Sequence, residues 1–187
     1  MVMTTGDRLP ITAVGSILWQ LALAAVALIG SLAFACIFPF VAIAVVCAAT
    51  MRGRDAVATV GALWAINQAV GFTLMGYPHD ASTYAWGIAI GLASIASVVI
   101  AMLIVGVGRP LTVVRLVAAF GAAFVAYEGL LFGFALFAGG LETFSADIVG
   151  LIARNDAVWF AGLMLLRLAL TGVAPRWFGN APAYRFA

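Results

Sequence analysis

The strongest constraint in the sequence is an apolar run from Leu9 to Met51 that carries no charge. A helix crosses a hydrocarbon core about 30 Å thick with about 20 apolar residues. The run is therefore too long for one crossing and predicts two, divided near Gly30, Ser31 and Pro39. Over the whole chain, 66% of residues are hydrophobic and 9% are charged, whereas soluble domains are about 25% charged. The sequence predicts an integral membrane protein.

Alternating apolar runs and short polar breaks continue along the chain. They predict an all-α integral membrane bundle of about six transmembrane helices, in a single domain over residues 1–187. The expected spans are 12–31, 33–51, 56–76, 83–107, 113–138 and 157–174. A longer linker from Gly139 to Asp156 precedes the last span. Its apolar spacing predicts a short amphipathic helix on the membrane surface.

The arginines are distributed unevenly between the two sides of such a bundle. Basic residues near span ends are retained in the cytoplasm. A cytoplasmic N-terminus puts seven arginines inside and leaves only Arg154 in the outer loops; the seven are Arg8, Arg52, Arg54, Arg109, Arg115, Arg176 and Arg185. We therefore expect a multi-pass protein of the plasma membrane, the inner membrane where a cell has two, with both termini in the cytoplasm.

Two charged residues lie at membrane depth, where a polar side chain needs a partner or a cavity. Glu128 lies near the middle of the fifth span and Arg167 near the middle of the sixth. Because consecutive spans are antiparallel, we expect the two at similar depth and predict an ion pair between them. The alternative is that they face a ligand or take part in proton transfer, since an arginine can bind an anion or an amide through two hydrogen bonds.

Three amide side chains also lie within the spans. Asn67 and Gln68 are adjacent in the third span, and adjacent helix positions point about 100° apart, so we expect at least one to face the interior. The amides either contact a ligand or form hydrogen bonds between helices. Gln20, in the first span, is assigned to interhelical hydrogen bonding.

Aromatic residues and the only histidine gather where the third span ends. The segment from Gly71 to Asp80 contains two glycines and a proline, so the helix is expected to stop near Gly76. His79 is either solvated or in contact with a ligand, and no metal site is predicted. The predicted substrate-binding residues are Asn67, Gln68, Phe72, Tyr77, His79, Trp86, Glu128 and Arg167.

Small residues recur on the first span at a spacing of four, as Ala27, Ser31 and Ala35. This spacing lets a second helix approach closely, either in a partner or within the bundle.

The architecture resembles the substrate-binding S-components of the energy-coupling-factor vitamin transporters. The resemblance implies that Ala27, Ser31 and Ala35 dock a transmembrane coupling subunit that works with ATPases, and that a small-molecule substrate binds near the outer face. The run ending Gly76-Tyr77-Pro78 is similar to the cobalamin-specific proteins of that family. That similarity implies cobalamin as the transported ligand. The cysteine expected in this region is absent, and the imidazole of His79 is a chemically suitable replacement for it that the sequence alone does not assign.

No nucleotide-binding loop, metalloprotease motif or paired nucleophile is present, so the chain is not expected to be an enzyme. Neither a cofactor nor a nucleic-acid partner is expected. The predicted function is capture and import of a vitamin-sized micronutrient. One alternative is a self-sufficient secondary transporter or metal permease that uses the Glu128–Arg167 pair. The other is an accessory membrane subunit that transports nothing.

Overall fold

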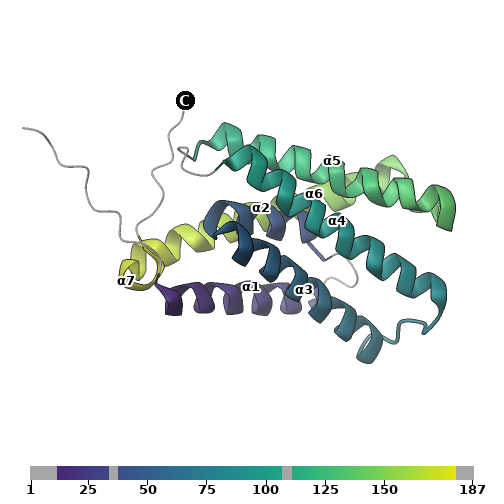
Figure 1. Ribbon diagram of the computed structural model, residues 1–187, viewed down its shortest axis with the longest axis horizontal. Helices are drawn as coiled ribbons and strands as arrows, with labels where there is room; N and C mark the ends of the chain where they lie inside the picture. Colours follow the sequence, from purple (N-terminus) through teal and green to yellow (C-terminus); the bar gives the residue numbers. More distant parts are fainter. Residues whose placement is uncertain (1–11, 34–37, 107–110, 180–187) are drawn as a thin grey trace, which may run out of the picture.

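The structure is a computed structural model that describes residues 12–33, 38–106 and 111–179 (Figure 1). Helices make up most of this part of the chain, which confirms the all-α prediction for it. The elements are α1 (Ala13–Ala33), α2 (Phe40–Thr50), α3 (Gly53–Thr73), α4 (Ala81–Val105), α5 (Val113–Ala138), the 3₁₀ turn η1 (Leu141–Phe144), α6 (Ala146–Val173) and α7 (Pro175–Phe178).

Four of the described helices are long and apolar enough to cross a bilayer, namely α3, α4, α5 and α6. Their outward faces carry large apolar side chains. Leu92 and Leu103 on α4 and Leu165 on α6 are each at least 65% exposed. Such a continuous apolar exterior marks a surface that is not in contact with water, and lipid is the solvent that suits it.

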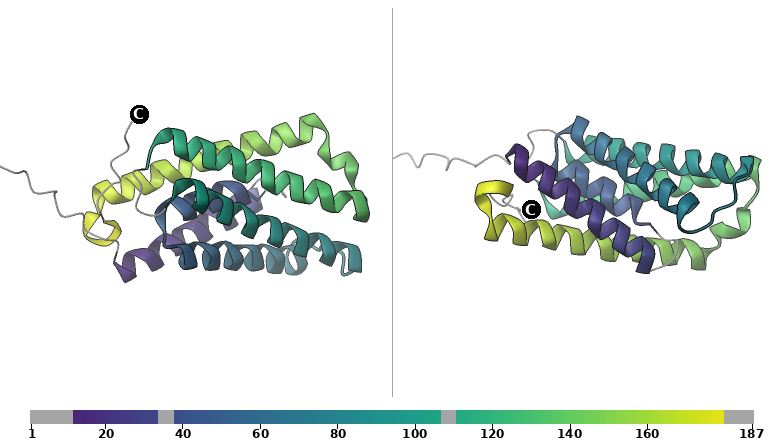
Figure 2. Two further views of the ribbon diagram at one scale, coloured as in Figure 1. Left: turned by 45° about the horizontal axis from the view of Figure 1, so that its top comes forward. Right: turned by 90° about the horizontal axis from the view of Figure 1, so that it is seen from below.

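The short helix α2 occupies the centre of the bundle. It contacts α3, α4, α5 and α6, and every residue from Phe40 to Cys47 is buried. A helix that is apolar on all sides belongs in a core. By contrast, α1 lies on the outside of the bundle, where it contacts α3 and α7 (Figure 2).

Helix α2 also changes the predicted span count. A second crossing was expected over 33–51, but the helix begins only at Phe40 and has 11 residues. At 1.5 Å per residue it is about 16 Å long, roughly half of a hydrocarbon core. Pro39 explains the late start, because it has no N–H and disfavours helix at the residue before it. The number of crossings therefore stays a prediction beyond the four long helices.

The prediction of a longer linker between the last two spans is wrong. Helix α6 begins at Ala146, well before the expected residue 157. Ser145 caps it, because its Oγ accepts a hydrogen bond from the N–H of Ile148 at 3.4 Å. The expected amphipathic surface helix is instead the first turns of α6, preceded by η1.

The two ends of the bundle differ in charge. Arg52 and Arg54 lie where α2 passes into α3, Arg115 lies in the first turn of α5, and Arg176 lies in α7. These segments all lie toward the left of Figure 1, and we call this the basic end. At the opposite end α3 and α5 finish while α4 and α6 begin. The chain termini, residues 1–11 and 180–187, lie outside the described residues.

Hydrogen bonds made by side chains join the helices across the interior. Gln20 Nε2 donates to Thr59 Oγ1 at 3.1 Å, linking α1 to α3, which confirms the interhelical role predicted for Gln20. Ser97 Oγ donates to the carbonyl oxygen of Ala123 at 3.2 Å, linking α4 to α5. Each such bond is worth about 0.6 kcal/mol in membrane bundles.

Helix α1 approaches α7 so closely that only glycine fits between them. A Cβ atom on Gly15 would collide with the backbone carbonyl of Trp177, which also accepts a hydrogen bond from the N–H of Thr12 at 3.2 Å. We expect Gly15→Ala to cost about 1–3 kcal/mol, because backbone has to move.

The matched control is Gly121→Ala on α5, where nothing lies within 4 Å of the new methyl group. Alanine favours helix over glycine by up to about 1 kcal/mol, so this change should be neutral or stabilising. Thermal melts of both variants in detergent micelles provide the comparison. Equal melting temperatures for the two variants would contradict the close contact between α1 and α7.

Candidate functional site

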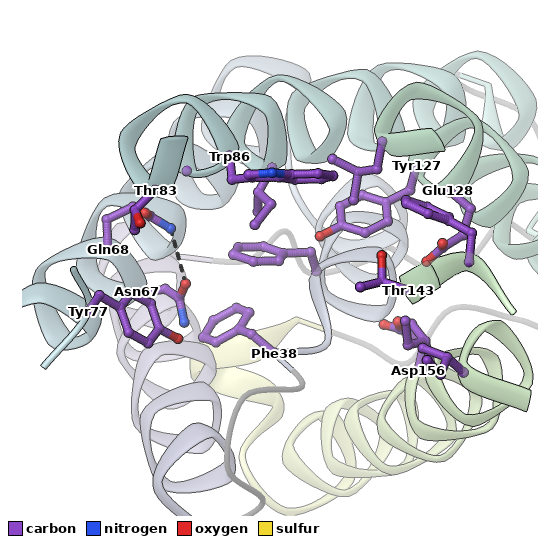
Figure 3. A pocket seen from close by; sticks show the side chains of 17 residues that line it. Phe38, Asn67, Gln68, Tyr77, Thr83, Trp86, Tyr127, Glu128, Thr143 and Asp156 are labelled. Atoms are coloured by element: carbon purple, nitrogen blue, oxygen red, sulfur yellow. Dashed lines mark hydrogen bonds between the residues drawn. The ribbon is translucent and has the colours of Figure 1, made fainter. Parts of the chain in front are cut away.

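A cavity of about 310 Å³ lies between the helices, on the side of the bundle away from the basic end (Figure 3). Its walls come from α2 to α6, together with η1 and the segments before α2 and α4. The lining residues are Phe38, Phe40, Asn67, Gln68, Tyr77, Thr83, Trp86, Gly87, Ile90, Tyr127, Glu128, Leu131, Thr143, Phe144, Ile148, Ile152 and Asp156. The volume is within the range of small-molecule sites, about 300–1,000 Å³.

One wall carries the two adjacent amides of α3. Asn67 and Gln68 both line the cavity, because their side chains converge and Gln68 Nε2 donates to Asn67 Oδ1 at 3.3 Å. Gly87 of α4 provides the room, since a Cβ atom there would lie 2.5 Å from Gln68 Oε1. The amides keep unused donor and acceptor capacity in this geometry, so they can orient a polar ligand group.

Aromatic rings form much of the remaining surface. Phe38 and Phe40 have ring centroids 4.4 Å apart, and Phe40 stacks with Tyr127 at 6.3 Å. Trp86 lies on the α4 side, where it packs edge-on against Phe134 at 4.9 Å. In Figure 3 the rings of Phe38, Trp86 and Tyr127 lie between the amides and the opposite wall. Apolar walls with a few polar groups are typical of ligand sites.

The opposite wall carries Asp156, which caps the N-terminus of α2. The carboxylate is 2% exposed, and its Oδ1 accepts a hydrogen bond from the N–H of Ala42 at 2.9 Å. The first N–H groups of a helix have no partner within the helix, and the preceding residue, Pro39, provides no side-chain cap. Asp156 therefore supplies from α6 the acceptor that α2 lacks.

Glu128 of α5 shares this wall with Asp156 (Figure 3). Glu128 lies ten residues before the end of α5 and Asp156 ten residues after the start of α6. In an antiparallel pair of helices these positions lie at the same depth. The Glu128 side chain is partly buried, and its Oε1 is fully buried and has no hydrogen-bond partner among the described residues. The cavity thus contains one carboxylate with a backbone partner and one carboxylate with an oxygen that has none.

The predicted ion pair between Glu128 and Arg167 is wrong. Arg167 lies eleven residues beyond Asp156, about 16 Å further along α6. Its Nη2 donates to the carbonyl oxygen of Phe178 at 2.9 Å, and its guanidinium lies over the rings of Trp19 and Phe178 at 5.4 and 5.7 Å. Arg167 therefore closes the basic end and does not line the cavity.

Phe72 and His79 also lie apart from the cavity lining. Phe72 stacks on Tyr84 at 4.9 Å, and His79 Nδ1 is hydrogen-bonded to Tyr84 Oη at 2.8 Å. This aromatic cluster surrounds the start of α4, which Asp80 caps. The backbone N–H of Thr83, and then its side chain, hold the pKa of the exposed Asp80 carboxyl below its usual range. The contacts within this cluster indicate that the rings stabilise the turn between α3 and α4.

The predicted docking stripe is not described by the structure. Ala27 and Ser31 fall within the backbone of α1, but their side chains lie outside what is described, and so does the whole of Ala35. Of the other predicted site residues, Asn67, Gln68, Tyr77, Trp86 and Glu128 come together around one cavity. Sequence reasoning missed several lining residues, chiefly Asp156, Tyr127 and Phe38.

Buried residues fill the centre of the bundle between the cavity and the basic end. Below Phe40 the residues of α2 from Val41 to Cys47 are fully or almost fully buried by the surrounding helices. At the basic end Trp19, which is 0% exposed, lies under Arg167. A cavity bounded in this way by buried residues has the concave shape of a site that holds a solute.

No protein-family model, curated protein or solved structure matches the chain. The chemistry of the cavity is the observation that bears on function, and it combines aromatic walls, a pair of amides and a pair of carboxylates.

Proposed function

We propose that this protein captures a vitamin-sized solute for import, as the substrate-binding S-component of a transport system in the plasma membrane. The observation that carries the proposal is the cavity between the helices, which combines aromatic walls with polar groups at two opposite sides. Concave sites of this kind bind small molecules by burying an apolar body and fixing its orientation through a few polar contacts.

The charge difference between the two ends supports an outward-facing cavity. Arg52, Arg54, Arg115 and Arg176 lie at the end away from the cavity, and basic residues are retained in the cytoplasm. A solute would therefore enter from outside. Movement to the cytoplasm needs a change of conformation, which a coupling subunit with ATPases would drive. The docking role of Ala27, Ser31 and Ala35 belongs to this proposal.

The size of the cavity favours a compact solute. A volume of about 310 Å³ equals about ten water molecules at roughly 30 Å³ each. A single aromatic ring with short substituents fits such a space. Cobalamin, with its corrin ring and nucleotide arm, is several times larger, and its capture would require the helices around the cavity to move apart.

Ligand binding by the purified protein tests the proposal. The probes are thiamine, pyridoxamine, pyridoxine, biotin and cobalamin, each measured by equilibrium dialysis in detergent micelles. We expect saturable binding of at least one compact vitamin, and a loss of about ten-fold or more in Trp86→Ala, because a ring that contacts the ligand is removed.

Phe72→Ala is the matched control, since Phe72 is an aromatic residue of the neighbouring cluster that does not line the cavity. Its affinity for the same vitamin should match that of the unmodified protein. If no vitamin binds, or if Phe72→Ala and Trp86→Ala have equal effects, the capture function at this cavity is wrong. The accessory-subunit alternative would then lead.

A self-sufficient secondary transporter is the second candidate, and the short helix α2 favours it. Discontinuous helices with their ends at mid-membrane form the binding sites of many such transporters, and α2 is about half a membrane long with its N-terminus beside the cavity. Proteoliposomes that contain only this chain separate the two candidates. Concentrative uptake driven by an ion gradient would establish the secondary transporter, whereas binding without uptake supports the S-component.

A further inference from the structure

The cavity carries acidic charge and no basic side chain. Glu128 and Asp156 are its only ionisable carboxyl groups among the lining residues, and none of those residues is an arginine, lysine or histidine. A cleft lined by charge of one sign, with walls of low dielectric constant, concentrates solutes of the opposite sign. The acidic lining of the cavity thus favours a positively charged solute.

The two carboxylates are not equivalent. Asp156 has a partner within the protein, because it accepts the N–H of Ala42 at the positive end of the α2 dipole. Among the described residues Glu128 has no such partner, and its buried Oε1 accepts no hydrogen bond from any of them. A buried charge is costly unless it is paired. Glu128 is therefore the group that a bound cation would satisfy.

The aromatic rings near Glu128 favour the same kind of ligand. Phe40 and Tyr127 stack at 6.3 Å, and Tyr127 directly precedes Glu128 on α5. The face of an aromatic ring attracts a cation within about 6 Å. The rings can also cover the apolar body of an organic ligand. An inorganic ion has no apolar body and would not make these contacts.

We propose that the captured solute is an organic cation with a planar body, whose ammonium group binds Glu128 while its ring lies among Trp86, Phe38 and Phe40. This inference rests on the proposed capture function and adds the class of the ligand. The amides Asn67 and Gln68, on the opposite wall (Figure 3), then contact the polar substituents at the far end of the solute.

Three compounds that share one ring test the charge of the ligand. Pyridoxamine, pyridoxine and 4-pyridoxate differ at one substituent, which is an ammonium, a hydroxyl or a carboxylate at pH 7. Hydrogen bonds to a charged group are worth about 1.5–3 kcal/mol, and 1.4 kcal/mol is a factor of ten. We therefore expect pyridoxamine to bind about ten-fold or more tightly than pyridoxine, and 4-pyridoxate to bind least.

The preference for pyridoxamine should disappear in Glu128→Gln, which keeps the size of the side chain. The matched control is Glu142→Gln in η1, where the glutamate is exposed and does not line the cavity. That variant should keep the preference. Thermal melts confirm that both variants are folded before the affinities are compared.

The possible outcomes separate this inference from the capture function. Tighter binding of pyridoxine or 4-pyridoxate than of pyridoxamine, or an unchanged preference in Glu128→Gln, overturns the cation assignment and leaves capture intact. Absence of saturable binding for these three compounds and for every vitamin of the wider panel overturns both.

Discussion

Replacement of Asp156 by alanine is expected to destabilise the protein by about 2–3 kcal/mol. The change removes a buried charged acceptor and leaves the N–H of Ala42 without its partner, and hydrogen bonds to charged groups contribute about 1.5–3 kcal/mol. Loss of a helix cap alone costs about 1 kcal/mol. In a chain of this length, the melting temperature in detergent micelles should fall by roughly 5–10 °C.

Asp156→Asn is the control for this prediction. The asparagine carbonyl oxygen can still accept the hydrogen bond from Ala42, so most of the stability should remain. The substitution also leaves Glu128 as the only carboxyl group among the described residues that line the cavity. An asparagine variant as unstable as the alanine variant would show that α2 does not depend on this cap.

Replacement of Arg167 by methionine is expected to cost about 2–4 kcal/mol. The substitution removes the guanidinium, and with it the hydrogen bond to Phe178 and the contacts with two rings. A desolvated cation–π contact contributes about 2 kcal/mol. Arg154→Met is the control, because Arg154 is an exposed arginine on the same helix. Surface substitutions of that kind change stability by about 0.5 kcal/mol or less.

A double-mutant cycle identifies the partner of Arg167. Arg167→Met combined with Trp19→Leu should show a coupling of about 1–2 kcal/mol, because the two side chains are in contact. Arg167→Met combined with Glu128→Gln should be additive within about 0.5 kcal/mol, as expected for sites far apart. A coupling above about 1 kcal/mol in the second cycle would restore the ion pair that the structure excludes.

Hydropathy located most helices because apolar runs directly reflect the requirement to cross lipid. The expected span 113–138 matches α5 at both ends, and the spans that became α1, α3 and α4 differ by three residues or fewer at each end. The method failed where helix and apolar run do not coincide. Asp147, Arg154 and Asp156 make the first turns of α6 polar, although Ser145 is a recognisable N-cap before them.

That one boundary explains the main error about the site. With the last span taken to begin at residue 157, Asp156 was assigned to an outer loop and Arg167 became the only charged residue opposite Glu128. The helix in fact starts at Ala146, about three turns earlier than predicted, so Asp156 lies within the helix at the depth of Glu128. The contact of Asp156 with α2 spans 114 residues of sequence, and no local pattern could have revealed it.

The cap on α2 has a consequence for how the protein is made. A helix of 11 residues is too short to cross a hydrocarbon core by itself. Synthesis proceeds from the N-terminus, so α2 emerges long before α6 supplies the carboxylate that accepts the N–H of Ala42. The helix at the centre of the bundle is thus translated before α6 and reaches its capped position only after α6 has been made.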